Sequence, residues 1–289
     1  MPFSIFLQYF LPKQAITALA GRFANLKAGK LTTSVITWFV ARYKVNMGEA
    51  ANPDIASYDT FNAFFTRPLK PDVRPIAQAD FVCPVDGVIS QFGSIAQDQI
   101  LQAKKHHYSV LSLVAGNQVL ADQFKNGLFA CLYLSPKDYH RIHMPCDGAL
   151  KSMTYVPGDL FSVNPATATN IPNLFARNER VVCEFESVLH GRFVMVLVGA
   201  TIVGSMATVW HALVDGAKDG VINPPRGRKI RSWLYDGKAI TLKQGDEMGR
   251  FLLGSTVVML FEKGSFAFNA NWLPTLPIKL GEMMGTSIH

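Results

Sequence analysis

The chain has 289 residues, enough for one large domain or two small ones, and 49% of them are apolar while 17% are charged. This composition excludes an intrinsically disordered chain. The 28 Lys and Arg residues outnumber the 21 Asp and Glu residues, so the net charge of +7 favours an anionic partner, and charge alone leaves nucleic acid, acidic lipid and acidic metabolites open.

The first 48 residues differ from the rest because they contain six basic side chains and no acidic one before Glu49. Apolar residues recur there at helical spacing in two stretches: Ile16, Leu19, Phe23 and Leu26, then Ile36, Phe39, Val40 and Tyr43. One interpretation is a helical hairpin that packs on the core. The other is a pair of basic amphipathic helices that lies on anionic lipid. We favour the second because no acid offsets the basic charge and large apolar side chains accompany it: Phe3, Phe6, Tyr9, Phe10 and Trp38.

Residues 58–69 predict a short helix that Pro68 ends, and the pattern changes after Pro71 and Pro75. From there on, short apolar runs alternate with Gly, Asn, Asp and Pro, which is typical of β-strands joined by turns. The sequence therefore predicts an α+β fold, with N-terminal amphipathic helices in residues 1–48 followed by a mostly antiparallel β core in residues 49–289.

An uncharged run of 18 residues, FVMVLVGATIVGSMATVW (193–210), reaches the lower length limit of a transmembrane helix. Val, Ile and Thr dominate it, and Gly199 and Gly204 interrupt it, so we predict two buried strands around a glycine turn instead. Residues 1–10 carry no positive charge and Pro12 follows, unlike the basic start of a cleavable signal peptide.

Asp86 is the first candidate site residue. It stands in FVCPVDGVIS (81–90), in an apolar context and directly before Gly87. An Asp-Gly pair is most often a turn in which the aspartate binds its own backbone. The alternative is a carboxylate that orients another side chain, and this segment alone leaves both open.

Two histidines three residues apart, His140 and His143, lie between the strand-like run LFACLYLSP and Pro145. On a helix they would share a face and could bind a metal, but these flanks favour an extended segment, in which their side chains point to opposite faces. No third ligand is signalled, and the four cysteines are too far apart for a zinc module or a disulfide scaffold. We therefore expect no metal, and two histidines that enter one cleft at different depths.

Gly254 and Ser255 stand inside the apolar run FLLGSTVVMLF (251–261), where a strand disfavours glycine. A hydroxyl that directly follows glycine can reach the preceding carbonyl carbon with no Cβ in its way. With a base to take its proton, the serine could attack that carbonyl and turn the amide into an ester, and elimination and hydrolysis would leave a pyruvoyl group. A histidine oriented by an aspartate activates hydroxyls in this way. From these residues alone, a Gly-Ser bulge in a core strand stays the alternative.

Six blocks cover most of residues 55–262: PVDGVIS (84–90), YLSPKDYHRIHMP (133–145), YVPGDLFSVN (155–164), NLFARNERVV (173–182), VGATIVGS (198–205) and MGRFLLGST (248–256). In sequence and order they resemble the proenzymes of bacterial phosphatidylserine decarboxylases, of the membrane-associated type. The LGST block alone would be a weak signal, whereas six blocks in register are specific.

The resemblance implies that the chain cuts itself between Gly254 and Ser255. The products would be a β chain of residues 1–254 and an α chain of residues 255–289, with a covalent pyruvoyl cofactor made from Ser255. The family's charge relay of Asp, His and Ser falls on Asp86, His143 and Ser255, and His140 matches a residue associated with decarboxylation. The pyruvoyl carbonyl would form a Schiff base with phosphatidylserine, CO₂ would leave, and His140 would act as the general acid that protonates the carbon before phosphatidylethanolamine is released.

The resemblance also implies a substrate that stays in the bilayer, so we expect a peripheral position on the cytoplasmic face of the cell membrane, with residues 1–48 placing the cleft at the headgroups. The implied partners are phosphatidylserine in an anionic membrane and the protein's own α and β chains. A homodimer of the processed heterodimer is a possible further assembly. Nucleic acid is not expected, because no recognised binding module is present. Two alternatives stay open: a pyruvoyl-dependent decarboxylase of a soluble amino acid, and an uncut lipid-binding homologue.

Overall fold

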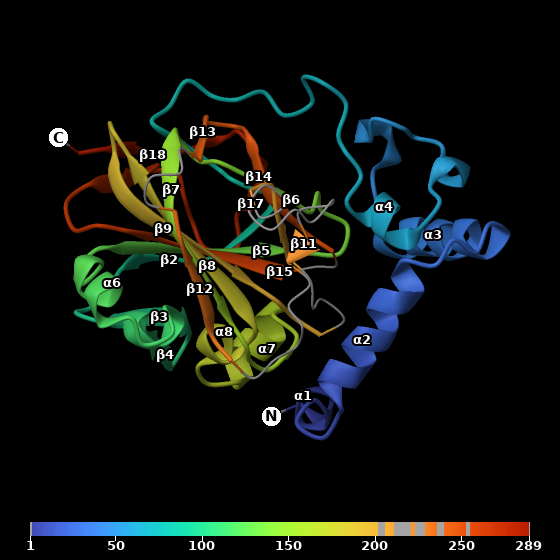
Figure 1. Cartoon of the computed structure of the whole chain (residues 1–289), viewed down its shortest axis with the longest axis horizontal. Coiled ribbons are helices and arrows are strands. Elements are labelled where there is room, and N and C mark those ends of the chain that lie inside the picture. Colours follow the sequence, from blue (N-terminus) through green and yellow to red (C-terminus); the bar gives the residue numbers. More distant parts are fainter. Residues whose placement is uncertain are drawn as a thin grey trace.

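The computed structural model describes residues 2–201, 206–210, 221–222, 229–235, 240–252 and 255–288. The chain begins with helices on one side of the molecule and continues into a core of antiparallel sheets (Figure 1). The predicted α+β class, with N-terminal helices before a mostly antiparallel β core, is confirmed.

The N-terminal helical unit contains α1 (Phe3–Leu7), α2 (Lys13–Ala24), α3 (Lys30–Tyr43) and α4 (Phe61–Phe65), with the short 3-10 helices η1 (Met47–Glu49) and η2 (Ile55–Ser57) before α4. A small cluster joins α3 to α4: Ile36, Phe39, Val45, Phe64 and Phe65. The helix predicted for residues 58–69 is shorter than expected. Thr60 caps its start by accepting the Ala63 N–H, and it ends ahead of Pro68.

α1 attaches this unit to the core. Ile5 is buried in the core, the Gln8 side chain accepts the backbone N–H of Ser162 at 3.0 Å, and Tyr9 packs edge-on against Phe161. Figure 1 shows α2 running from this contact up to α3 and α4, beside the β core.

The apolar face of α2 is uncovered. Leu19 is 69% exposed, Phe23 47% and Leu26 53%. Within the described part of the chain, ten of the twenty exposed large apolar side chains lie between residues 6 and 38. Such a concentration in α1, α2, α3 and their connections marks a contact surface, because singly scattered apolar residues are the norm elsewhere.

The large sheet has nine strands in the described part of the chain, each antiparallel to its neighbours. Eight of them follow the order β12 (Arg231–Leu234), β7 (Gly148–Val156), β8 (Arg180–Ser187), β9 (Gly191–Val198), β15 (Ser255–Phe261), β5 (Leu128–Leu134), β2 (Gly87–Ser94) and β17 (Pro277–Ile278), while β13 (Thr241–Leu242) also pairs with β7. β15 is therefore a central strand, hydrogen-bonded to β5 on one side and β9 on the other.

Smaller sheets and short helices cover the two faces of the large sheet. One small sheet has the order β11 (Val221–Ile222), β10 (Met206–Thr208), β14 (Glu247–Phe251) and β6 (Arg141–His143), and another has β1 (Phe81–Val82), β18 (Met283–Ser287) and β16 (Phe266–Phe268). The remaining elements are β3 (Gln99–Ala103), β4 (His106–Ser109), α5 (Val110–Leu113), α6 (Gln118–Gln123), α7 (Pro165–Asn170) and α8 (Leu174–Arg177).

Alternation along β15 separates two hydrophobic cores. Val257 and Met259 pack with residues of the two smaller sheets, whereas Val258 and Leu260 pack with residues of α5 to α8. Both faces of this strand are buried, which explains why its sequence is a continuous apolar run.

The uncharged run of residues 193–210 falls in β9 and β10, as predicted. Gly199 follows β9, and Gly204, part of the predicted turn, lies outside the described residues. Among the residues that the structure describes, no helix is long and apolar enough to span a bilayer.

Candidate active site

The predicted site residues gather at one end of the large sheet. Ser255 is the first residue of β15 and pairs with Leu134, the last residue of β5. On the other side of β5, β2 begins directly after Asp86. The chain that leaves β5 then carries His140 and, in β6, His143. Gly254, the other half of the predicted cleavage site, lies outside the described residues, and Ser255 is described through its place in the strand.

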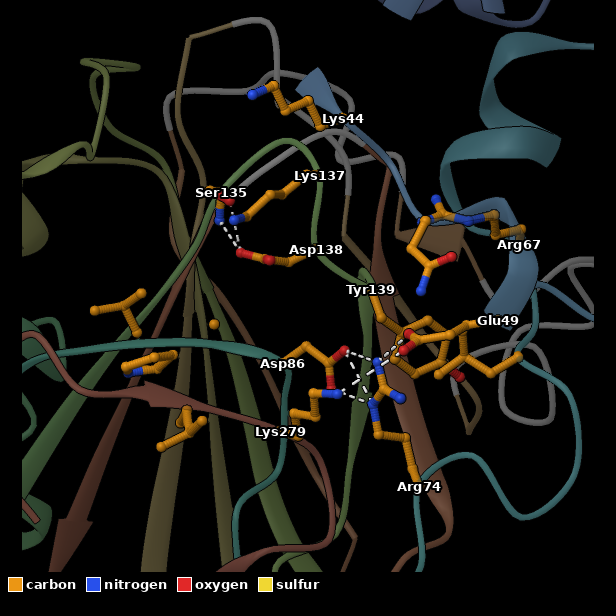
Figure 2. A pocket seen from close by; sticks show the side chains of 16 residues that line it. Lys44, Glu49, Arg67, Arg74, Asp86, Ser135, Lys137, Asp138, Tyr139 and Lys279 are labelled. Atoms are coloured by element: carbon orange, nitrogen blue, oxygen red, sulfur yellow. Dashed lines mark hydrogen bonds and ion pairs between the residues drawn. The ribbon is translucent and has the colours of Figure 1, made fainter. Parts of the chain in front are cut away.

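Arg74 holds Asp86 in a two-pronged ion pair (Figure 2). Its Nε donates to the two carboxylate oxygens at 2.9 and 3.1 Å, and its Nη2 donates to Oδ2 at 2.6 Å. The same Nη2 donates to Glu49 at 2.6 Å. The hydrogen bonds to Asp86 raise the pKa of Arg74, and the hydrogen bond from Arg74 lowers the pKa of Glu49. The three side chains thus form one charged cluster that joins the helical unit to the sheet.

The backbone explains why glycine follows Asp86. A Cβ at Gly87 would lie 2.4 Å from the carbonyl oxygen of Tyr133 on β5, too close for any side chain. Asp86 itself does not close a local turn, because its Oδ1 accepts the backbone N–H of Leu280, 194 positions away, at 2.9 Å. The Asp-Gly pair therefore marks a strand start with a buried carboxylate, and the turn interpretation is wrong.

His143 is held in a single orientation by two partners. Its Nδ1 lies 2.7 Å from the carbonyl oxygen of Gly245, and since a carbonyl only accepts, Nδ1 carries the proton. Its Nε2 lies 3.1 Å from the Tyr139 hydroxyl, which therefore donates. Burial lowers the pKa of His143, so its imidazole is neutral at pH 7. A neutral imidazole can accept a proton at Nε2, and here it can do so once the Tyr139 hydroxyl releases that lone pair.

His140 is more deeply placed than His143. It is fully buried against the ring of Phe65, with ring centroids 4.1 Å apart. Its Nδ1 donates to the carbonyl oxygen of Asp138 at 2.7 Å, while its Nε2 has no hydrogen-bond partner within the described residues. Burial lowers the pKa of His140 to about 3. The two histidines thus lie at different depths. Both are neutral at pH 7, with their one proton on Nδ1, so neither is an imidazolium that could act as an acid at Nε2.

The structure brings these residues to one place without joining them all. Asp86 and His143 each have their own partners, and no hydrogen bond between them is present among the described atoms. Tyr139 is the link that sequence reasoning missed: it lines the pocket beside Asp86 and donates to His143. Burial raises the pKa of Tyr139 to about 12, so its hydroxyl stays protonated. The signal for it was present, since it immediately precedes His140 in the quoted block.

Metal binding finds no support in the part of the chain that the structure describes, which contains no group of three His, Cys, Asp or Glu side chains that could hold an ion. Both histidines place Nδ1 against a backbone carbonyl. The four cysteines are buried and unpaired, and burial raises the pKa of the Cys83 thiol, so it is unreactive.

Comparison with known proteins identifies the family of the chain. The family model for phosphatidylserine decarboxylase matches residues 61–286, and a second model, described as PSD, matches residues 3–44. A phosphatidylserine decarboxylase proenzyme of Dechloromonas aromatica is 66% identical over 282 residues, covering 98% of this chain and 97% of its own. Those of Albidiferax ferrireducens and Methylobacillus flagellatus are 66% and 62% identical over 277 and 284 residues, covering 96% and 98% of this chain and 94% and 98% of theirs. The chain belongs to the phosphatidylserine decarboxylase family.

Proposed function

We propose that the protein is a proenzyme that cuts its own chain between Gly254 and Ser255 and, once cut, decarboxylates phosphatidylserine to phosphatidylethanolamine. One observation carries the proposal: in a chain of this family, the start of β15, Asp86 and both histidines converge on one end of the large sheet. The products would be a β chain of residues 1–254 and an α chain of residues 255–289.

The cleavage step assigns a role to His143. Its Nε2 would take the hydroxyl proton of Ser255 while the serine oxygen bonds to the Gly254 carbonyl carbon. The carbon–nitrogen bond then breaks, and the proton passes to the released nitrogen, which leaves the two segments joined by an ester. Loss of the α-proton of residue 255 expels the Gly254 carboxylate and separates the chains, and water then replaces the nitrogen as ammonia to give the pyruvoyl group. Val257, two positions along β15 from residue 255, packs in the same core as Ile142 of β6, the strand that ends at His143. Neutral His143 supports this role, and the charge of Asp86 acts on it by raising a pKa that burial lowers.

Asp86 needs a change of partner to orient His143. In the structure its carboxylate is bound by Arg74 and the Leu280 N–H. We propose that Asp86 acts on the cleavage step by stabilising the imidazolium that forms on His143 when the hydroxyl proton is taken. This works through the charge of Asp86, which raises the pKa of His143, while the Gly245 carbonyl keeps the ring in place at Nδ1.

The pyruvoyl cofactor made from Ser255 supplies a carbonyl that receives the substrate amine and accepts the electrons left when CO₂ departs. The residues present fit such a group. Two buried polar atoms near the start of β15, Nε2 of His140 and Oγ1 of Thr256, have no partner in the described part of the chain. Orphaned buried polar atoms are rare and mark places where a ligand or reacting group completes the bonding.

His140 must first take up a proton before it can donate one. Burial lowers its pKa to about 3, so it is neutral at pH 7, and its free Nε2 would hold the proton of the substrate ammonium only with the negative charge of the bound substrate beside it. The same nitrogen would return that proton to the α-carbon after CO₂ leaves. His140 thus gains its proton when the substrate amine binds and gives it back after CO₂ leaves, so the number of protons is conserved.

The helical unit supplies a membrane-binding surface in this proposal. The apolar face of α2 is exposed, and residues 1–48 carry basic side chains and no acidic one. Both features suit a peripheral position on an anionic membrane, which we place at the cytoplasmic face of the cell membrane. We assign residues 1–48 to membrane association and residues 49–289 to catalysis. Because α3 packs on α4, a deletion that keeps the shared cluster must stop before Lys30.

The decisive experiment is the mass of the purified wild-type protein under denaturing conditions, followed by an assay of CO₂ release from phosphatidylserine and from free serine. Two fragments that split at Gly254, the smaller with a pyruvoyl mass, together with turnover of the lipid alone, support the proposal. A single intact chain in a well-folded sample would instead indicate an uncut lipid-binding homologue. Turnover of free serine would indicate the soluble-substrate alternative.

A further inference from the structure

A pocket of about 510 Å³ lies between the helical unit and the β core. Residues from η1, from the end of α3 and from the segment after α4 form one wall, and residues from the start of β2, from the loop after β5 and from β17 form the other. Its charged lining consists of five cations and three carboxylates: Lys44, Arg67, Arg74, Lys137 and Lys279; Glu49, Asp86 and Asp138.

The carboxylates of this pocket are already committed. Asp86 and Glu49 are bound by Arg74, and Glu49 also lies 3.8 Å from the ammonium group of Lys279. Asp138 accepts the hydroxyl and backbone N–H of Ser135, both at 2.7 Å. No carboxylate is left for the other cations of the pocket.

Arg67 is the most deeply buried cation of this pocket, and it forms no ion pair with any residue that the structure describes. It is only 4% exposed, and its Nε has no hydrogen-bond partner among the described residues. Its guanidinium has one long hydrogen bond, 3.5 Å from Nη1 to the carbonyl oxygen of Phe64, and lies 5.2 Å from the centre of that ring. Figure 2 shows Arg67 reaching toward the middle of the pocket, apart from the cluster of Arg74 with Asp86.

An unpaired buried guanidinium calls for an anion. Taking a charge out of water costs several kcal/mol unless an opposite charge and hydrogen bonds replace the lost hydration. Stacking on Phe64 alone would explain the packing of Arg67, yet it leaves the Nε donor unsatisfied on a pocket wall. Burial lowers the pKa of Arg67, because a charged guanidinium is less favourable away from water when no anion is paired with it.

Lys44 adds a second feature at the same wall. It is the residue that ends α3, and it adopts a left-handed backbone conformation with φ 56°, which favours glycine or asparagine. This C-cap conformation turns the chain out of α3 at Lys44, which lines the pocket. Lys44 has no acidic partner among the described residues.

We propose that Arg67, assisted by Lys44, binds the phosphodiester of the lipid substrate. This inference rests on the proposed function, because it assumes that the substrate is a phospholipid. Arg67 matches a phosphodiester well, since a planar guanidinium can donate two parallel hydrogen bonds to two phosphate oxygens.

The substrate carboxylate is the other anion that Arg67 could bind, and the reaction argues against it. The carboxylate loses its charge when CO₂ leaves, so an arginine that paired with it would stabilise the starting state more than the transition state and slow the step. The phosphodiester keeps its charge throughout. A cation on the phosphodiester therefore adds affinity without opposing the chemistry.

The position of Arg67 also fits a lipid that enters from the membrane. Arg67 follows α4, and Lys44 ends α3, so both come from the helical unit that bears the exposed apolar face. In phosphatidylserine the phosphodiester lies between the acyl chains and the amine. A phosphodiester held by the helical unit would direct the amine toward Asp86 and the end of the sheet.

The test uses binding in the absence of chemistry. The Ser255→Ala proenzyme is titrated with dihexanoyl phosphatidylethanolamine, which carries the phosphodiester and lacks the carboxylate. We expect Arg67→Gln in this background to weaken binding by roughly tenfold or more, since charge-assisted hydrogen bonds are lost, and Arg67→Lys to restore part of it. Arg192→Gln, at the opposite end of β9 from the site, is the matched control and should leave binding unchanged.

Kinetics of the cut enzyme give the second readout. Arg67→Gln should raise KM for dihexanoyl phosphatidylserine by a similar factor and change kcat by less than about twofold, the pattern of a contact made equally in the ground and transition states. Thermal unfolding of each variant separates loss of the site from loss of the fold, and Arg67→Lys serves if Arg67→Gln does not fold.

Three results would overturn the inference. Unchanged binding of the ethanolamine lipid by Arg67→Gln, together with weaker binding of the serine lipid, would assign Arg67 to the carboxylate. Competition by inorganic phosphate as strong as by the short-chain lipid would assign the site to free phosphate. A fall in kcat with unchanged KM would make Arg67 part of the chemistry. Failure of the proposed function looks different, because the wild-type cut enzyme would then release no CO₂ from phosphatidylserine.

Discussion

Large apolar side chains have opposite surroundings in α2 and in β15. Leu19 and Phe23 on α2, and Leu26 just beyond it, are about half exposed or more, whereas Val258 and Leu260 in β15 are completely buried. Both segments carry large apolar side chains in a regular pattern. β15 has a protein layer on each face, whereas these three side chains remain largely open to solvent. An apolar pattern therefore predicts burial in some apolar phase, which for α2 we propose is the lipid bilayer.

The largest expected effect separates the two regions by function. Ser255→Ala should abolish self-cleavage and all CO₂ release, because it removes both the nucleophile and the source of the cofactor. Binding to anionic liposomes should persist, since α2 is untouched. Denaturing mass spectrometry, CO₂ release and liposome sedimentation measure the three properties. Ser265→Ala, ten residues further along, is the control and should be cut normally. Cleavage of the Ser255→Ala chain at the same place would contradict the assignment of the nucleophile.

The second effect compares equal truncations in the two regions. In the uncut Ser255→Ala background, Leu260→Ala should lower the free energy of unfolding by about 2–5 kcal/mol, because it leaves a cavity in a fully buried site. Leu19→Ala should change it by less than about 0.5 kcal/mol, as expected for an exposed position. Urea unfolding measures both. Equal losses would show that α2 is covered in solution and would remove the contrast.

The third effect tests the burial of His140 through pH. A histidine whose pKa falls from 6.5 to about 3 on folding contributes stability that is present above pH 6.5 and is lost as the pH falls below it, because the unfolded chain then binds the extra proton. Between pH 7 and pH 5, this one group should reduce the free energy of unfolding by about 2 kcal/mol. His140→Gln should remove that part of the slope in urea unfolding of the uncut protein. An unchanged slope would mean that His140 is hydrated.

The smallest effect tests the apolar face of α2 at one side chain. Leu19→Ser should weaken binding to anionic liposomes by roughly tenfold, since moving one leucine side chain out of water is worth about 1.5–3 kcal/mol. Self-cleavage should be unaffected. The control is Val119→Ser on α6, a residue that is 73% exposed and far from α2. If both variants bound liposomes as well as the parent protein, the basic residues alone would account for membrane binding.

Periodicity and turn chemistry predicted the architecture well, because both depend on residues that are close together in the sequence. Spacing of apolar residues predicted the helices in residues 1–48, and the flanks of His140 and His143 predicted an extended segment with the two side chains at different depths. Spacing could not tell whether the α2 stripe meets protein or lipid, because both environments select the same residues.

The partners of the site residues could not be predicted, because they come from distant parts of the chain. Asp86 is bound by Arg74 and by the Leu280 N–H, contacts set by how β2 and β17 align and by the path of the preceding loop. Arg67 sits in an unremarkable Thr-Arg-Pro stretch. Its lack of a counter-ion is a property of the folded pocket and leaves no trace in the local pattern.

The central place of β15 has a consequence for the lifetime of the protein. A cut before Ser255 would leave a 35-residue chain whose first strand, β15, is hydrogen-bonded to β5 on one side and to β9 on the other. Its later strand β17 pairs with β2 at the edge of the same sheet, and β16 and β18 belong to a second sheet with β1. We therefore expect the large sheet to form before the cut, and the hydrogen bonds of β15 to β5 and β9 to hold the two chains together afterwards. After denaturation the short chain would have to find its place as a separate molecule. The lifetime of the mature protein would thus be set by a slow rate of unfolding, and a cut molecule that unfolds would not refold readily.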